Sequence, residues 1–177
     1  MQTIRAWKIT MLEFALLFFF PFFMVYSAAS DILTMTIPNQ VSLLLIAGFF
    51  VLAVAIGFDM STILWHLAAF AAVLFGGFAL FAIGQMGAGD VKLSASTALW
   101  LGWSIHLVEY LILFSFIGGV LVMINLFSRG RFVPEFAGRM EWFVRLYNSN
   151  KVPYGVALGA AGIMVYPSTV WMKSIIV

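Results

Sequence analysis

The sequence has no cysteine and very little charge, and these two absences narrow the possible kinds of protein. Without cysteine there are no disulfide bonds, thiolate nucleophiles or metal sites with cysteine ligands. Charged residues make up 9% of the 177 residues, whereas they make up about a quarter of a soluble domain. The formal net charge of +2 is too small to indicate nucleic-acid binding. Neither a soluble domain nor a nucleic-acid-binding protein is therefore indicated.

Hydrophobic residues are correspondingly abundant. They make up 64% of the chain, and the mean hydropathy of +1.09 is typical of an integral membrane protein. The length allows about six spans of roughly 20 residues and leaves no room for a separate soluble domain. We therefore expect a single transmembrane domain over residues 1–177.

The apolar runs are separated by proline, glycine, asparagine or charged residues, and they predict an all-α protein with about six transmembrane helices. The fourth run is short, and Gly102 to His106 forms a tight hinge to the fifth, so these two could also be one long helix. The predicted spans are residues 10–29, 40–57, 63–84, 90–103, 106–127 and 152–173.

The distribution of lysine and arginine predicts the orientation in the membrane. If the N-terminus is outside, the cytoplasmic segments hold six basic residues and the opposite side holds three, which favours this orientation. The six are Lys92, Arg129, Arg131, Arg139, Arg145 and Lys151, and the three are Arg5, Lys8 and Lys173.

Two further segments have alternative interpretations. In the cytoplasmic segment 128–151, Phe136, Met140, Phe143 and Tyr147 recur at helical spacing, which predicts a short amphipathic helix on the membrane surface. The N-terminal run from Met11 to Ala29 resembles a cleavable signal peptide, but it is longer than the usual signal core, and cleavage would leave Asp31 close to a free terminus. We therefore expect an uncleaved first span.

Two aspartates are the strongest functional candidates in this apolar chain. Asp31 lies shortly before Ile37-Pro38-Asn39, and Asp90 ends the motif Gly87-Ala88-Gly89-Asp90. A carboxylate at membrane depth costs about 2.5–3.5 kcal/mol or more on insertion scales, so such a residue is a functional candidate by default. The predicted orientation places both aspartates at the cytoplasmic face.

Each motif alone also has a structural explanation. The glycines before Asp90 tolerate unusual dihedral angles and let another backbone approach closely, which would suit an extended substrate beside a carboxylate. They would equally suit a turn between two spans with Asp90 at a helix start. Asp31 could be an interfacial loop residue before Pro38, which breaks the chain, and Asn39, which is a natural N-cap.

Together, the two aspartates suggest acid–base chemistry. Two carboxylates held close together resist joint ionisation, so one of them keeps a proton near neutral pH. An ionised carboxylate can then take a proton from water while the protonated one polarises a scissile carbonyl. The alternative is a small proton- or cation-coupled transporter or channel subunit, although such proteins tend to hold acids near midspan in broken helices. An inactive scaffold protein, in which the aspartates are dispensable, is a third possibility.

Three motifs follow one another along the chain. They are Asp31 with Ile37-Pro38-Asn39, then Gly87-Ala88-Gly89-Asp90-Val91-Lys92-Leu93, then Lys151-Val152-Pro153-Tyr154-Gly155-Val156-Ala157. In this order the motifs resemble the type IV prepilin peptidase family, and the match is closest to the short members that serve tight-adherence (Flp) pili. The resemblance covers nearly the whole chain.

The resemblance implies that Asp31 and Asp90 are the catalytic pair of a GxGD-type aspartyl endopeptidase of the inner membrane. Such an enzyme removes the charged leader from prepilins, whose leader is followed by a hydrophobic helix, and it needs no cofactor. The longer members also N-methylate the new terminus, but this sequence has no cysteine pairs and no glycine-rich methyl-donor site. We therefore expect cleavage without methylation. Membrane lipids are the other expected contact.

The remaining motif residues are expected to support the site. These are Gly87, Gly89, Lys92, Pro38, Asn39, Pro153, Tyr154 and Gly155. Lys92 is two positions from Asp90 and so does not share its helical face, which favours snorkelling to lipid headgroups.

Outside these motifs, polar residues are few. His66 and His106 stand alone near tryptophans, without clustered acidic or cysteine ligands, so no metal site is expected. Glu109 lies inside the fifth predicted span, and the sequence assigns it no role.

Overall fold

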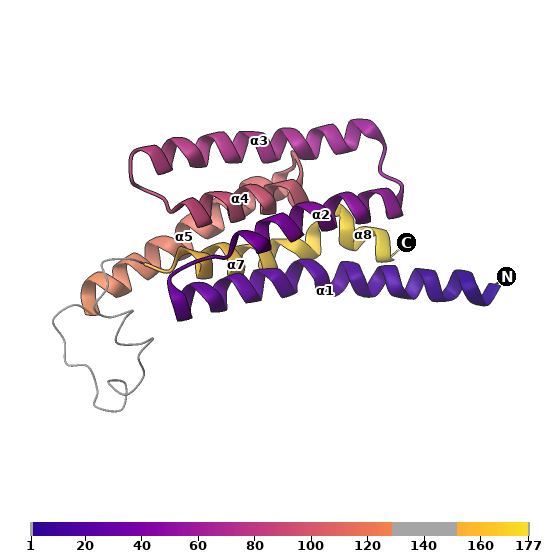
Figure 1. The fold of residues 1–177 in the computed structure, drawn as a ribbon, viewed down its shortest axis with the longest axis horizontal. Coiled ribbons are helices and arrows are strands. Elements are labelled where there is room, and N and C mark those ends of the chain that lie inside the picture. Colours follow the sequence, from indigo (N-terminus) through magenta and orange to yellow (C-terminus); the bar gives the residue numbers. More distant parts are fainter. Residues whose placement is uncertain (1, 129–151, 177) are drawn as a thin grey trace, which may run out of the picture.

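The computed structural model describes residues 2–128 and 152–176, and all secondary structure within these ranges is helical (Figure 1). This confirms the predicted all-α class. The predicted amphipathic helix at 128–151 lies, apart from its first residue, outside the described residues. The helices are α1 (Gln2–Thr34), α2 (Asn39–Ile56), α3 (Met60–Ala82), α4 (Ala88–Leu101), α5 (Ile105–Ser128), α7 (Tyr154–Val165), a 3-10 turn (Tyr166–Ser168) and α8 (Val170–Ile176).

Within the part of the chain that the structure describes, five stretches of helix are long and apolar enough to cross a membrane, so the predicted count of six is not confirmed. The predicted span that does not qualify is α4. It has 14 residues and is therefore about 21 Å long, which is shorter than the roughly 30 Å hydrocarbon core. The five are Met11–Thr34, Asn39–Ile56, Met60–Ala82, Ile105–Phe127 and Tyr154–Ser174.

Helix α4 lies in the interior of the bundle and is packed by α2, α3 and α7. Every residue from 93 to 101 is buried, including three serine and threonine side chains. Small residues such as Ala95, Ser96 and Ala98 let neighbouring backbones approach closely, which is how helices associate inside membranes. A short, partly polar helix is therefore stable here because other helices shield it.

The two ends of the bundle differ in chemistry. In Figure 1, the end of α1, the α3–α4 turn, the end of α5 and the start of α7 lie together at one end. The opposite end holds an aromatic cluster in which the Trp171 indole donates to the Trp100 carbonyl and the Trp100 indole donates to the Leu45 carbonyl. His66 is buried in this cluster and pairs with the Leu99 carbonyl at 2.6 Å, so it is a core residue there.

Helix α1 extends further than predicted, and this changes the place of Asp31. The apolar run ends at residue 29, but the helix continues to Thr34 and ends where Met35 adopts a positive φ of 55°. Hydroxyl bonds replace apolar packing in this last turn: Thr34 donates to the Ser30 carbonyl at 2.8 Å. Asp31 is thus a helical residue. The predicted N-cap, Asn39, is instead the first residue of α2, because Pro38 occupies the cap position.

Candidate active site

Asp31 is buried in the last turn of α1 against the start of α7. Its side chain is 6% exposed, and its Oδ2 atom accepts a hydrogen bond from the Gly155 amide at 2.7 Å. The first amides of a helix lack partners within the helix and carry the positive end of its dipole. The start of α7 therefore stabilises a negative charge on Asp31.

Gly155 is required at this contact by simple geometry. A Cβ atom built on Gly155 would lie 2.8 Å from the Asp31 Cβ and 2.9 Å from its Oδ2, closer than real Cβ contacts allow. It would also lie 3.0 Å from the Ile37 side chain. Any larger residue would push α1 and α7 apart at the carboxylate.

Asp90 lies in the first turn of α4, outside the five candidate spans. Its carboxylate accepts a hydrogen bond from the Gly87 amide, so it also caps its own helix. A Cβ atom on Gly87 would lie 2.7 Å from Asp90 Oδ2, and the close return of the carboxylate therefore needs glycine. Burial, with a smaller contribution from the nearby charge of Asp31, raises the pKa of Asp90 to about 7, and the hydrogen bond from the Gly87 amide opposes this change.

Ile37 connects the two aspartates. A Cβ atom on Gly89 would lie 3.3 Å from the Ile37 Cβ, so the loop after α1 packs directly on the first turn of α4. The same side chain reaches Gly155 at the start of α7. The three sequence motifs therefore converge on one place, and the charge of Asp31 acts on Asp90 there.

Lys92 makes a contact that the snorkelling interpretation missed. Its ammonium group donates a hydrogen bond to the Asn39 Oδ1 at 2.9 Å, which joins the first turn of α4 to the first residue of α2. Both side chains are exposed. The link ties the helix that carries Asp90 to the loop that follows Asp31.

Two of the predicted supporting residues serve packing rather than the carboxylates. Pro153 is the N-cap residue of α7 and is buried. The ring of Tyr154 packs on α5, where a Cβ atom on Gly118 would lie 3.2 Å from it. These two residues anchor the start of α7, which in turn presents the Gly155 amide to Asp31.

Sequence reasoning missed the role of Ile37, although the residue was part of a recognised motif. Ile37 precedes a proline, which forces an extended backbone at this position. This was the only signal in the sequence that Ile37 lies outside the flanking helices. Sequence reasoning also gave Glu109 no partner. In the structure, Glu109 Oε2 lies 3.0 Å from His106 Nδ1 in the first turn of α5, at the end opposite the aspartates.

The arrangement brings together two interacting carboxylates in different environments, which suits acid–base chemistry. One carboxylate is held by a helix amide, the other has a raised pKa, and they interact electrostatically. Within residues 2–128 and 152–176, no group of three or more histidine, aspartate or glutamate side chains could hold a metal ion.

The chain matches a known protein family. Residues 18–124 match the family model described as the type IV leader peptidase family. This range holds both aspartates and extends over more than half of the chain. No curated protein and no solved structure matches the sequence.

Proposed function

Because the chain belongs to the type IV leader peptidase family and is thus a protease of prepilins, we propose that Asp31 and Asp90 are its catalytic pair. The observation that carries this proposal is that two carboxylates from different helices, buried Asp31 and half-buried Asp90, interact electrostatically. The convergence of their motifs around Ile37 supports it further.

The environments of the two aspartates suggest different roles. Asp31 accepts the Gly155 amide and acts as the ionised base that takes a proton from water. Asp90, with a pKa of about 7, holds the shared proton and donates it to the carbonyl oxygen of the scissile bond. The water oxygen adds to the carbonyl carbon and gives a tetrahedral diol. The proton on Asp31 then passes to the leaving nitrogen as the C–N bond breaks, and Asp90 recovers its proton.

The protein is a multi-pass membrane protein, and its family acts in the inner membrane. We further propose that the active site faces the cytoplasm, which the six-to-three distribution of basic residues supports. The order of the motifs supports prepilins of tight-adherence pili as the substrates. Cleavage without N-methylation remains part of the proposal, because the sequence offers no recognisable methyl-donor site.

Co-expression with a candidate prepilin tests the proposal. The wild type should shift the prepilin to the size expected after leader removal, and Asp31→Asn and Asp90→Asn should each abolish the shift. Asp59→Asn is the matched control, because Asp59 is an exposed aspartate at the N-cap of α3, at the opposite end of the bundle. Normal processing by either active-site variant would refute the catalytic pair. A transporter would give no processing by the wild type.

A further inference from the structure

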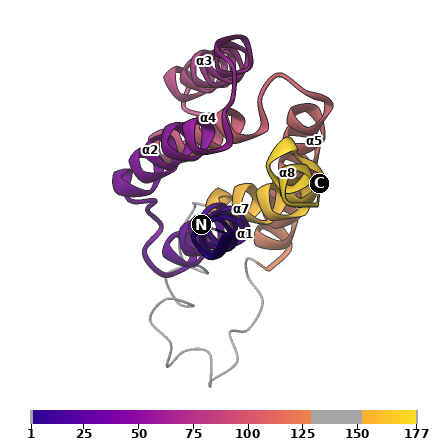
Figure 2. The ribbon, with the colours of Figure 1, turned by 90° about the vertical axis from the view of Figure 1, so that its right-hand side faces the viewer.

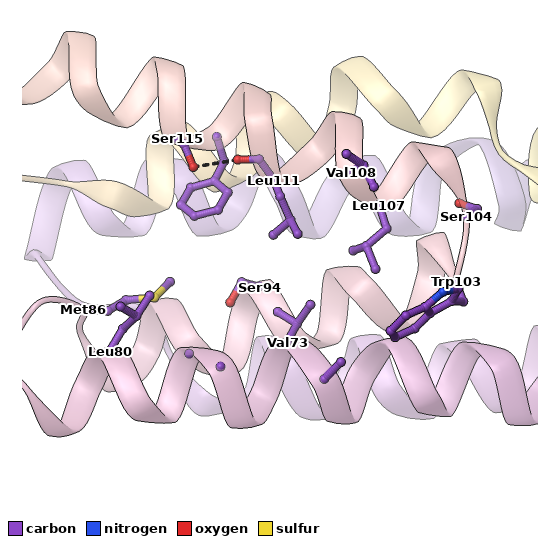
Figure 3. Close-up of a pocket in the computed structure, with 14 residues that line it drawn as sticks. Val73, Leu80, Met86, Ser94, Trp103, Ser104, Leu107, Val108, Leu111 and Ser115 are labelled. Carbon is purple, nitrogen blue, oxygen red and sulfur yellow. Dashed lines mark hydrogen bonds between the residues drawn. The ribbon is translucent and has the colours of Figure 1, made fainter.

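An apolar groove lies between α3 and α5, with α4 at its base (Figure 3). Its volume is about 540 Å³. Side chains of α5 and of α3 and α4 point into this space from opposite sides, with Met86 and Leu80 at one end and Trp103 at the other. Figure 2, viewed along the bundle, shows α3 and α5 well apart. We call this feature the α3–α5 groove.

One end of the groove lies beside the turn that leads into the Asp90 motif. Met86 directly precedes the Gly87–Asp90 motif. Ser94 lines the groove from α4 and is four residues after Asp90, so the two side chains lie on the same face of that helix. A molecule in the groove therefore extends along α4 towards the Asp90 carboxylate.

The groove is elongated parallel to the helices. Its lining extends from Ala72 to Leu80 on α3 and from Leu107 to Ser115 on α5. At 1.5 Å per residue, each of these stretches is about 12 Å long. This shape suits two or more turns of a helix lying against α3 and α5.

The lining suits an apolar partner. The hydroxyl groups of Ser94, Ser104 and Ser115 donate to backbone carbonyls of their own chain segments, at 3.0, 2.9 and 2.7 Å. An apolar partner therefore leaves none of these donors unpaired. On α3, a Cβ atom at Gly76 would meet nothing within 4 Å, so this position presents open backbone to the groove. Small residues of this kind permit close helix packing in membranes.

A smaller groove between α2 and α3 is less suited to a helix that must reach Asp90. The groove between α2 and α3 measures about 340 Å³ and is lined by Lys92 and Ala95, which lie on a different face of α4 from Asp90. The hydrogen bond from Lys92 to Asn39 joins two of its lining residues. A substrate there would be directed to that link rather than to Asp90.

We propose that the α3–α5 groove holds the apolar helix of the prepilin, with the leader end at Met86 and the scissile bond beside Asp90. This rests on the proposed function, since it assumes a substrate whose apolar helix follows the cleaved leader. Helices α2, α3 and α7 pack on α4. A membrane helix that reaches Asp90 along α4 must therefore approach from a side of α4 that these helices leave open.

Filling the groove tests the proposal. Gly76→Leu places a side chain in the open space of the groove without a clash, and it should raise the KM for full-length prepilin about tenfold. Gly119→Leu is the matched control, because Gly119 is also an exposed glycine in a membrane span with nothing within 4 Å of its Cβ position, but it lies outside the groove. Equal KM values for the wild type and both variants would overturn the proposal. Absence of cleavage by the wild type would instead refute the proposed function.

Cross-linking gives an independent measurement, made simple by the absence of native cysteine. In the Asp90→Asn background, Ser115→Cys should form disulfides with single cysteines placed along the prepilin helix. Phe116→Cys is the control, because the neighbouring Phe116 is 70% exposed but does not line the groove. Equal cross-linking at both positions, no cross-linking, or cross-linking only to a second copy of the chain would overturn the proposal.

Discussion

At the residue scale, the candidate site depends on two glycines that allow backbone amides to reach carboxylates. Gly155 donates to Asp31, and Gly87 donates to Asp90. A Cβ atom built on either glycine would lie within 3 Å of the carboxylate that accepts the hydrogen bond from that glycine. Hydrogen bonds of this kind favour the charged form of an acid, whereas burial favours the neutral form. The balance of these two effects sets which aspartate holds the proton.

Gly155→Ala tests the first of these contacts. The added methyl group would clash with the Asp31 side chain and lengthen its bond to the amide, so kcat for prepilin cleavage should fall about tenfold or more. Gly119→Ala, which meets open space, should keep wild-type activity. Steady-state kinetics on purified, folded protein would measure both. An unchanged kcat for Gly155→Ala would show that this contact does not serve catalysis.

Asp90 should make the stability of the protein depend on pH. Burial raises its pKa from 3.8 to about 7, so the folded state binds more protons than the unfolded state between these values. The free energy of unfolding therefore falls as pH rises from about 4 to about 7, by at most about 4 kcal/mol. Asp90→Asn removes this effect. Its thermal midpoint in detergent, relative to the wild type, should be higher at pH 8 than at pH 5. An equal difference at both values would contradict the assignment.

At the element scale, the link between α2 and α4 positions the two aspartates relative to each other. A hydrogen bond from Lys92 to Asn39 joins the motif of Asp90 to the motif that follows Asp31. Ile37 adds an apolar contact to the same junction, against Gly89. Helix α4 is therefore held in register at the end where the chemistry is proposed.

A double-mutant cycle tests this link. Lys92→Met and Asn39→Ala should each reduce kcat/KM for prepilin by about three- to tenfold, the effect of losing one hydrogen bond of about 0.5–1.5 kcal/mol. The double variant should lose no more than the worse single variant, because both remove the same contact. Additive losses would show that the two residues act separately.

The sequence predicted most helices but placed their ends less well. Periodic apolar runs located α2, α3 and α5 because lipid-facing helices must be apolar along their length. The apolar runs ended α1 too early. Its last turn contains Ser30, Asp31 and Thr34, whose side chains form hydrogen bonds there, and such polar residues lower the hydropathy as a loop would. The apolar runs also counted α4 as a span although it is shielded by protein rather than by lipid. The Lys92–Asn39 contact joins two distant motifs, and no local pattern in the sequence indicates it.

At the scale of the whole molecule, the bundle separates a polar end from an aromatic end. The two aspartates, Lys92 and Asn39 are gathered at one end, whereas Trp100, Trp171 and His66 fill the other. Buried indole and imidazole groups at the aromatic end are paired with backbone carbonyls, which satisfies polar groups where water is scarce. One end is thus held by aromatic packing, and the other gathers the polar side chains of the proposed site.

This polarity makes the orientation testable with single cysteines in the cysteine-free chain. Gln85→Cys in the α3–α4 turn should react with a membrane-impermeant maleimide only from the cytoplasmic side, in inverted vesicles. Asp59→Cys at the start of α3 should react only in intact spheroplasts. Both positions are exposed, so access to the reagent depends on the side of the membrane. The opposite labelling pattern would place the aspartates on the outer face and contradict cytoplasmic cleavage.

The most direct test of the catalytic pair is the pH dependence of kcat/KM for prepilin cleavage by the purified enzyme. A pair that shares one essential proton gives a bell-shaped profile, whose limits belong to the pair rather than to either residue. With the pKa of Asp90 raised to about 7, activity should decline above neutral pH, and it should decline at low pH when Asp31 also becomes protonated. A profile that stays flat from pH 5 to pH 9 would contradict the shared proton and with it the proposed mechanism.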